Sequence, residues 1–143
     1  MKPERNTEST ARRTARTTAK SSALRKTDTS VVQAAVPRYL GELDRRGGLR
    51  GTDIANITDV SKATVSRWRS GEIKPRPRNE LILSDLYYVV GRLQEYYAPD
   101  EIRLWLYARH PQLDGKRAID LINRDRTIDV LNVIDRLDND VYV

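Results

Sequence analysis

The stretch TDIANITDVSKATVSRWRSG, residues 52–71, decides the fold of this 143-residue chain. Its apolar positions suit two short helices folded across a tight turn, because one straight helix would scatter these side chains over too wide an arc. They are Ile54, Ile57, Val60, Val65 and Trp68. This is the pattern of a helix-turn-helix.

The second helix of the pair is predicted over residues 62–70. Ser61 is a good N-cap, since its hydroxyl accepts an amide hydrogen bond that the first turn leaves unmade, and Gly71 ends the helix. At about 100° per residue, Val65 and Trp68 face inward, while the opposite face carries small side chains flanked by long cations. Such a face can enter the major groove of DNA. The alternative to DNA binding is that the amphipathic helix pair has a purely structural role and only packs against the rest of the protein.

The predicted DNA contacts combine this exposed face with the cations that follow it. Arg can donate two hydrogen bonds to guanine, and Lys can reach guanine or phosphate. Cations beyond the helix would bind phosphates and set the register without reading bases. The predicted contacts are Ser61, Lys62, Ala63, Thr64, Ser66, Arg67, Arg69 and Lys74.

In this register the stretch resembles the Xre/Cro-type helix-turn-helix family. That family has a small residue in the middle of its first helix, where Ala55 stands, and Gly-Val-Ser at the turn, where Asp59, Val60 and Ser61 stand. Asp59 departs from the pattern. We expect a positive φ at this position, which Gly adopts freely and Asp tolerates better than most residues.

Composition limits the protein to a few classes. The length allows one ordinary domain or two small ones, and two small ones fit the pattern better. The chain has no cysteine, no apolar run long enough to cross a membrane and no secretory signal. We therefore expect a cytoplasmic protein without a membrane partner.

Charge divides the chain unevenly. Residues 1–30 hold 8 basic and 3 acidic residues, residues 31–98 hold 11 and 8, and residues 99–143 hold 7 and 9. Residues 1–29 are polar and are expected to form a disordered basic tail, since they cannot bury enough surface to offset the ordering entropy. Four cations of this tail would lie along DNA or RNA or simply be solvated: Arg12, Arg13, Arg16 and Lys20.

The remaining elements are all predicted helices. One helix begins near Ser30 and ends at Gly47, and a long one runs over residues 79–97. The long helix is apolar on more than one side, so it would bridge two cores or pair with a second copy. One further helix is capped by Asp100, and a short one spans residues 118–123. Thr127 caps the last helix, whose inward apolar positions are Ile128, Leu131, Ile134 and Leu137.

The segment WLYARHPQLDGKRAIDLINRDRTIDVLNVIDRLDNDVYV, residues 105–143, resembles the toxin-binding domain of the antitoxins called Xre, ParS or MbcA. The shared pattern is Trp-Leu, a following Pro, a Gly before basic residues, Asp-Leu-Ile, and a last helix ending in Val-Tyr-Val. Family members usually have Pro where Ala118 stands. The resemblance implies an all-α protein with a tail (1–29), a helix-turn-helix and linking helix (30–98), and a toxin-binding domain (99–143).

This family implies a specific function. Such antitoxins cover the active site of a RES-domain toxin that consumes NAD, and they repress their own operon by binding operator DNA. The toxin-facing residues carried over by position are Lys116, Arg117, Asp120, Asp138, Tyr142 and Val143. The alternatives are a helix-end charge for Asp120 and a core contact for Tyr142. A homodimer that joins a larger toxin–antitoxin assembly is also expected.

An enzyme is the rival class, and the residues disfavour it. With one histidine, His110, and no thiol, the chain can assemble neither a nucleophilic triad nor a typical zinc site. Asp125, Asp129 and Asp135 fall at mixed helical phases and are explained as a solvated face. We expect no cofactor, no metal and no catalysis. The alternative function is a stand-alone Xre-type regulator whose C-terminal half dimerises or senses a ligand.

Overall fold

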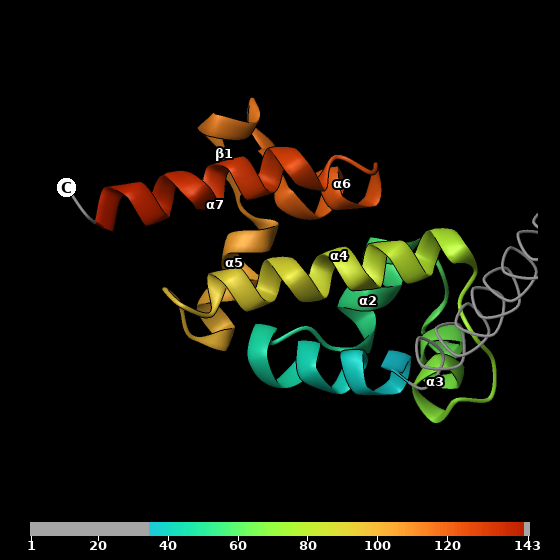
Figure 1. Ribbon diagram of the computed structural model, residues 1–143. Helices are drawn as coiled ribbons and strands as arrows, with labels where there is room; N and C mark the ends of the chain where they lie inside the picture. Colours follow the sequence, from blue (N-terminus) through green and yellow to red (C-terminus); the bar gives the residue numbers. More distant parts are fainter. Residues whose placement is uncertain (1–34, 142–143) are drawn as a thin grey trace, which may run out of the picture. The chain divides into compact units, whose positions relative to one another are not determined.

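The computed structural model describes residues 35–141, which are helical apart from one small hairpin (Figure 1). The predicted tail (1–29), Tyr142 and Val143 lie outside the described residues. The described part of the first helix covers residues 35–47. The elements that follow are α2 (Gly51–Thr58), α3 (Lys62–Ser70), α4 (Pro77–Leu93), α5 (Pro99–Tyr107), β1 (Arg109–His110), the 3₁₀ turn η1 (Pro111–Leu113), β2 (Lys116–Arg117), α6 (Ala118–Asn123) and α7 (Thr127–Val141).

The predicted helix-turn-helix is confirmed as α2 and α3. The Ser61 hydroxyl accepts a hydrogen bond from the Thr64 amide at 3.1 Å, so Ser61 caps α3 as expected. Gly71 ends the helix with φ 78°. Asp59 takes the expected left-handed conformation, with φ 57°, and forms the turn between the two helices.

The boundaries of α4 and α5 differ from those predicted. The long helix was predicted to start at residue 79, but Pro77 is the first residue of α4, because its missing amide and fixed φ suit the first helical position. The helix ends at Leu93, four residues before the predicted end. Ala98, not Asp100, is the N-cap of α5, and the Glu101 carboxylate accepts the Ala98 amide at 3.0 Å.

Two further differences lie in the C-terminal part. The segment between α5 and α6, for which the sequence predicts no helix, contains an antiparallel hairpin that pairs Arg109 with Arg117 and His110 with Lys116. Two-residue strands are too short for any sequence period to reveal them. The buried residues of α7 are Val130, Val133 and Ile134, whereas Ile128 is 66% exposed. The predicted inward position of Ile128 is therefore wrong, because the helix is rotated to pack on α4 and α6.

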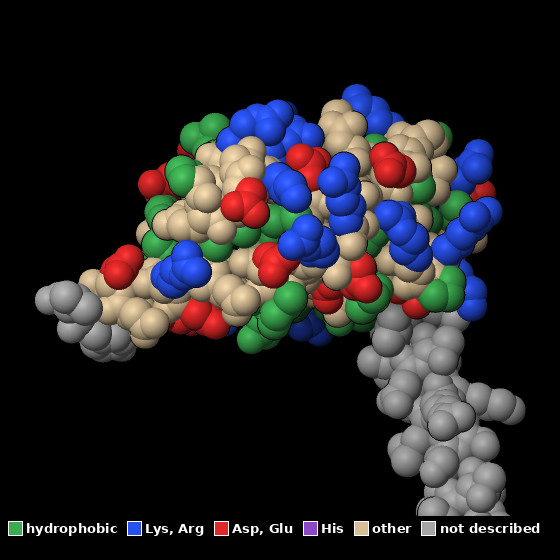
Figure 2. All heavy atoms as spheres, turned by 90° about the horizontal axis from the view of Figure 1, so that it is seen from above, with side chains coloured by type: hydrophobic (Ala, Val, Ile, Leu, Met, Phe, Trp, Pro, Cys, Tyr) green, Lys and Arg blue, Asp and Glu red, His purple; other side chains and the backbone are tan. Residues whose placement is uncertain are grey.

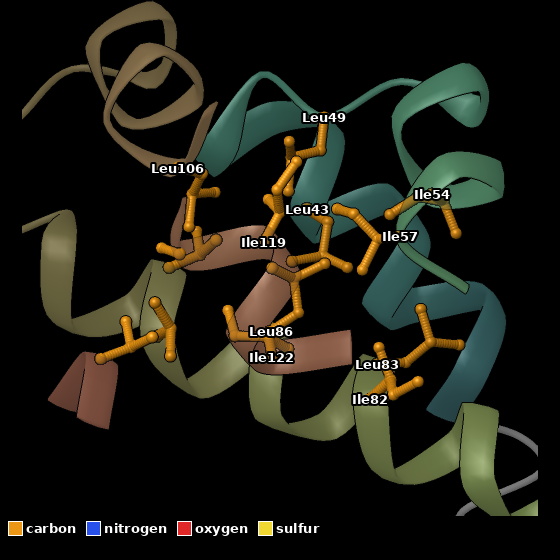
Figure 3. Close-up of a cluster of buried hydrophobic side chains, with 14 of the residues drawn as sticks. Leu43, Leu49, Ile54, Ile57, Ile82, Leu83, Leu86, Leu106, Ile119 and Ile122 are labelled. Carbon is orange, nitrogen blue, oxygen red and sulfur yellow. The ribbon is translucent and has the colours of Figure 1, made fainter. Parts of the chain in front are cut away.

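One hydrophobic cluster joins the helix-turn-helix to the C-terminal helices (Figure 3). Ile119 and Ile122 of α6 lie among side chains of the first helix, α2 and α4, including Leu43, Ile57 and Leu86. The described residues from Val36 onward form one compact unit, and the predicted boundary between residues 98 and 99 lies inside it. On α4, Val89 is buried, while Leu81 and Tyr88 are 50% and 55% exposed.

Polar contacts also tie the two predicted halves together. The Asp53 carboxylate on α2, whose side chain is 5% exposed, accepts hydrogen bonds from the Tyr107 hydroxyl at 2.6 Å and from Arg103 Nη2 at 3.2 Å, both on α5. It also accepts the Arg50 amide at 2.9 Å. A buried carboxylate is stable only when it is bonded in this way, so α5 helps to hold the start of α2.

A second polar contact joins α6 to the helix-turn-helix. The Asn123 side-chain amide donates to the Ile57 carbonyl at the end of α2, and Arg78 Nη2 of α4 donates to the Asn123 carbonyl at 3.0 Å. The end of α6 is thus fixed by α2 on one side and α4 on the other.

Because the core is shared, we expect residues 36–141 to unfold in one transition. Trp68 lies in α3 and Trp105 in α5, so the single-tryptophan variants W68F and W105F each report one predicted half. In each variant the fluorescence transition in urea should coincide with the circular-dichroism transition of the helices. Two separated midpoints in either variant would show that the halves unfold independently.

The Asp53 network predicts an acid dependence of stability. Burial raises the pKa of Asp53, but hydrogen bonds from Tyr107, Arg50 and Arg103 outweigh it and leave this pKa below its ordinary 3.8. Because the folded-state pKa is lowered, the ionised carboxylate stabilises the fold fully at pH values above the ordinary pKa of 3.8. This stabilisation is lost as the pH falls through the folded-state pKa. The variant D53N should lose about 1–3 kcal/mol in its free energy of unfolding at pH 7.

The same variant should show a shallower fall of stability between pH 5 and pH 3, about the range in which a folded and an unfolded aspartate differ in protonation. Denaturant titrations at several pH values measure both effects. An acid slope equal to that of the wild type would rule out a stabilising role for the ionised Asp53 carboxylate.

Candidate nucleic-acid and partner interfaces

The structure presents the predicted DNA-reading face on α3. Val65 and Trp68 are buried at 1% and 2% exposure, and they fix the helix on α2 and the core. Thr64, one of the predicted contacts, is half-buried. The exposed residues on and around this helix are Ser61, Lys62, Ala63, Ser66, Arg67, Arg69 and Lys74. The structure therefore leaves these predicted contacts exposed on α3, at its N-cap and on the segment that follows it.

The cations of this surface are not neutralised by carboxylates. None of Lys62, Arg67 and Arg69 forms an ion pair with another described residue, and neither does Lys74. Arg67 and Arg69 occupy the last turn of α3, and because they are two residues apart their side chains leave the helix on widely separated sides. These cations can therefore bind phosphates or base edges without first breaking an internal ion pair.

The second group of predicted residues begins at the hairpin. Arg117 of β2 donates to the carboxylate of Asp120 of α6 through Nε at 2.9 Å and through Nη2 at 3.0 Å. These bonds from Arg117 lower the pKa of Asp120 against the opposing effect of burial, with smaller contributions from Arg124 and Arg109. The carboxylate therefore stays ionised, and the two side chains form a rigid, two-point pair. Lys116 precedes this pair and is half-buried.

Tyr107 connects this pair to α2. Its ring lies under two guanidinium groups, with the Cζ of Arg103 4.9 Å and the Cζ of Arg117 5.9 Å from the centroid. Burial and the hydrogen bond to Asp53 raise the pKa of Tyr107 to about 12, so the hydroxyl remains a donor. The candidate partner residues are thus linked to the helix-turn-helix by direct contacts.

A polar hollow of about 390 Å³ lies where these elements meet, and we call it the α2–α6 hollow. Its walls include Asn56, Asp59, Tyr107, Arg117, Asp120 and Arg124. Of these residues, only Arg117 and Asp120 were predicted from the sequence to contact a partner. The others come from helices far apart in the sequence, and no local motif marks them as neighbours.

Asp138 lies apart from this hollow. Its carboxylate on α7 accepts a hydrogen bond from Arg92 Nη2 of α4 at 2.6 Å, and Arg92 also bonds Asp135 at 2.9 Å. These two bonds fasten the C-terminal end of α7 to α4. The structure thus gathers Arg117 and Asp120 at one place and Asp138 at another, while Tyr142 and Val143 are outside its described part.

The residues weighed for catalysis have structural contacts. His110 Nε2 lies 2.7 Å from the Trp105 carbonyl oxygen, and the two rings stack with centroids 4.4 Å apart. Asp129 pairs with Arg126 at 2.8 Å, and Asp125 occupies a turn with φ 61°. Within residues 35–141 no three His, Asp or Glu side chains are grouped as a metal site would require. No helix in that range is long and apolar enough to cross a membrane.

Comparison with known proteins gives consistent relatives, although no protein-family model matches the chain. The mycobacterial cidal antitoxin MbcA of Mycobacterium tuberculosis is 30% identical over 98 residues, which cover 68% of this chain and 87% of that protein. A probable mycobacterial cidal antitoxin of the same organism is 32% identical over 96 residues, covering 67% of this chain and 82% of its own length.

A solved structure supports the same assignment. The fold matches a chain from the crystal structure of the M. tuberculosis MbcT–MbcA toxin–antitoxin complex with a TM-score of 0.65 and 27% identity. The match covers 75% of this chain and 96% of that chain. Sequence and fold therefore agree, and this chain belongs to the family of the mycobacterial cidal antitoxin MbcA.

Proposed function

We propose that this antitoxin neutralises a RES-domain toxin that consumes NAD, by covering its active-site entrance, and represses its own operon through the helix-turn-helix. The observation that carries the proposal is the match to nearly the whole of a chain from a toxin–antitoxin complex, 96% of its length. This chain also carries, in order, the helix-turn-helix and the C-terminal segment that resembles a toxin-binding domain.

The toxin-binding surface is built from Arg117 and Asp120 together with the end of α7. The Arg117–Asp120 pair is 38% and 40% exposed in its side chains, so a partner can bond to the unused lone pairs and donors. Asp138 keeps 36% of its side chain exposed beside Arg92. Tyr142 and Val143, which follow α7, complete the proposed surface. Binding of these residues at the active-site entrance would exclude NAD.

The DNA-binding surface is α3 with the segment after it. Its unpaired cations and its small side chains at Ala63 and Ser66 suit close approach to a major groove. The repressor would act as a homodimer on a two-fold operator and join toxin in a larger assembly. The exposed Leu81 and Tyr88 on α4 support self-association, because large apolar side chains favour burial.

Growth of a bacterial host tests toxin neutralisation. The host would express the neighbouring reading frame, as the candidate toxin, alone or with the wild-type chain or its variants. The variant R117D/D120R keeps opposite charges three residues apart but exchanges their positions, so a purely structural pair survives and a partner contact is lost. We expect wild-type rescue and no rescue by this variant, with a loss of more than about 2 kcal/mol in binding free energy.

A matched exchange on the first helix, E42R/R46E, swaps the Arg46–Glu42 pair of 2.6 Å and should retain rescue. A chain ending at Asp138 keeps the Arg92–Asp138 bond and should fail to rescue. A neighbouring protein that is not toxic, together with specific DNA binding by this chain, would instead support the stand-alone Xre-type regulator.

Substitutions of two arginines on α3 distinguish base recognition from phosphate binding. The variant R67A should lose about 1–3 kcal/mol on the DNA upstream of its own reading frame and little on a scrambled fragment. The variant R69A should weaken binding to both fragments equally and lower the salt slope by about one. Fluorescence anisotropy over a series of salt concentrations measures both. Equal losses of R67A on both fragments would show that Arg67 contacts phosphate only.

A further inference from the structure

We infer that the toxin docks across the α2–α6 hollow, so that α2 of the helix-turn-helix supplies part of the toxin-binding surface, and that an acidic segment of the toxin occupies the hollow. The inference rests on the proposed toxin-binding function and extends it. It adds Asn56 and Arg124, which neither the sequence resemblance nor the fold match assigns, to the residues that meet the toxin.

The two walls of the hollow come from the two predicted halves of the chain. Asn56 and Asp59 are exposed residues at the end of α2, and Arg117, Asp120 and Arg124 face them from β2 and α6. The proposed toxin residues Arg117 and Asp120 thus share one concave surface with the helix-turn-helix. A partner that bonds to this pair would contact α2 as well.

The walls are held in place before any partner binds. The Asn123 side chain bonds the Ile57 carbonyl across the floor, and the Tyr107 hydroxyl bonds the Asp53 carboxylate beside it. Both contacts join C-terminal elements to α2. A surface fixed in this way loses little conformational entropy on binding, which favours its use as a docking site.

Charge favours an acidic occupant. Arg109 and Arg124 lie close enough to lower the pKa of Asp120, yet no described carboxylate forms an ion pair with either of them. Among described residues, the guanidinium group of Arg109 donates a hydrogen bond only to the Gly115 carbonyl, at 3.2 Å. Their charge is therefore available to a partner carboxylate, which would bond a guanidinium group at two points.

The wider surface shows the same polarity. Between residues 107 and 126 the chain has five Lys and Arg residues and three Asp residues, whereas α7 has four Asp residues and one Arg. The C-terminal third therefore combines a net basic region around the hairpin and α6 with a net acidic α7. Figure 2 shows Lys and Arg side chains over the middle of the face on which β1 and α6 lie, with few toward the C-terminal end of α7.

The hollow itself suits a polypeptide better than a nucleic acid. Asp59 and Asp120 stand in its walls, and their carboxylates would repel the continuous phosphates of a nucleic-acid backbone. The amide of Asn56 and the Arg117–Asp120 pair offer both donors and acceptors, which match a peptide carrying one or a few acidic side chains. Cations that form no ion pair with another described residue also lie on and after α3, at Lys62, Arg67, Arg69 and Lys74.

Paired substitutions at two positions test the inference. With the full-length chain and the purified RES-domain toxin of the neighbouring reading frame, N56E and R124E should weaken binding by about tenfold or more, because each places a carboxylate against an acidic segment. R124K keeps a cation at position 124, and N56K adds one at position 56. Both variants should bind the toxin within about threefold of the wild type. R38E, on an exposed residue of the first helix, is the charge-matched control and should bind like the wild type.

Calorimetric titration gives the affinities, and thermal melting shows whether each variant folds. Toxin binding by N56E and R124E equal to that of the wild type would overturn the inference, as would equal losses for the Glu and Lys variants. A larger loss of R124E on a DNA fragment than on the toxin would assign the hollow to nucleic acid and also overturn it. Failure of the wild-type chain to bind the toxin would refute the proposed function itself.

Discussion

The packing of α6 against the helix-turn-helix is the constraint on which the rest of the structure depends. Ile122 is fully buried, and Ile119 and Leu121 are nearly so, although α6 has only six residues. Each such side chain contributes about 1.5–3 kcal/mol when it leaves water, which a short helix needs because its own hydrogen bonds cannot sustain it. The helix-turn-helix therefore provides the surface on which α6 forms, and α6 in turn positions Asp120 and Arg124.

The sequence predicted those features whose signals are local. The cap at Ser61, the left-handed turn at Asp59 and the buried Val65 and Trp68 are all confirmed, because short-range hydrogen bonds and helical period determine them. The family resemblance is confirmed by the relatives, and with it the expectation of an antitoxin rather than an enzyme. The contacts of the reading face and of the toxin surface remain predictions.

Features that depend on tertiary contacts could not be predicted in the same way. The Asp53 carboxylate sits in the first turn of α2, where sequence alone indicates an ordinary exposed residue, yet Tyr107 and Arg103 bury it. Ile128 fitted the inward stripe of α7 by spacing, but the packing of α4 and α6 selects Val130 and Val133 instead. The α2–α6 hollow likewise depends on contacts about 50 residues or more apart along the chain, which no periodicity encodes.

The shared core bears on how the two proposed activities relate. Because Tyr107 bonds Asp53 at the start of α2, and Asn123 bonds Ile57 near its end, α2 is held at both ends by elements that carry the proposed toxin contacts. The cations of α3 lie on the other helix of the pair, which packs on α2 through Val65 and Trp68. A toxin bound at the hollow would thus rest on the helix that supports the reading helix. Asp59, which lines the hollow, also forms the turn between α2 and α3. The two proposed surfaces would therefore share one helix pair and meet at its turn.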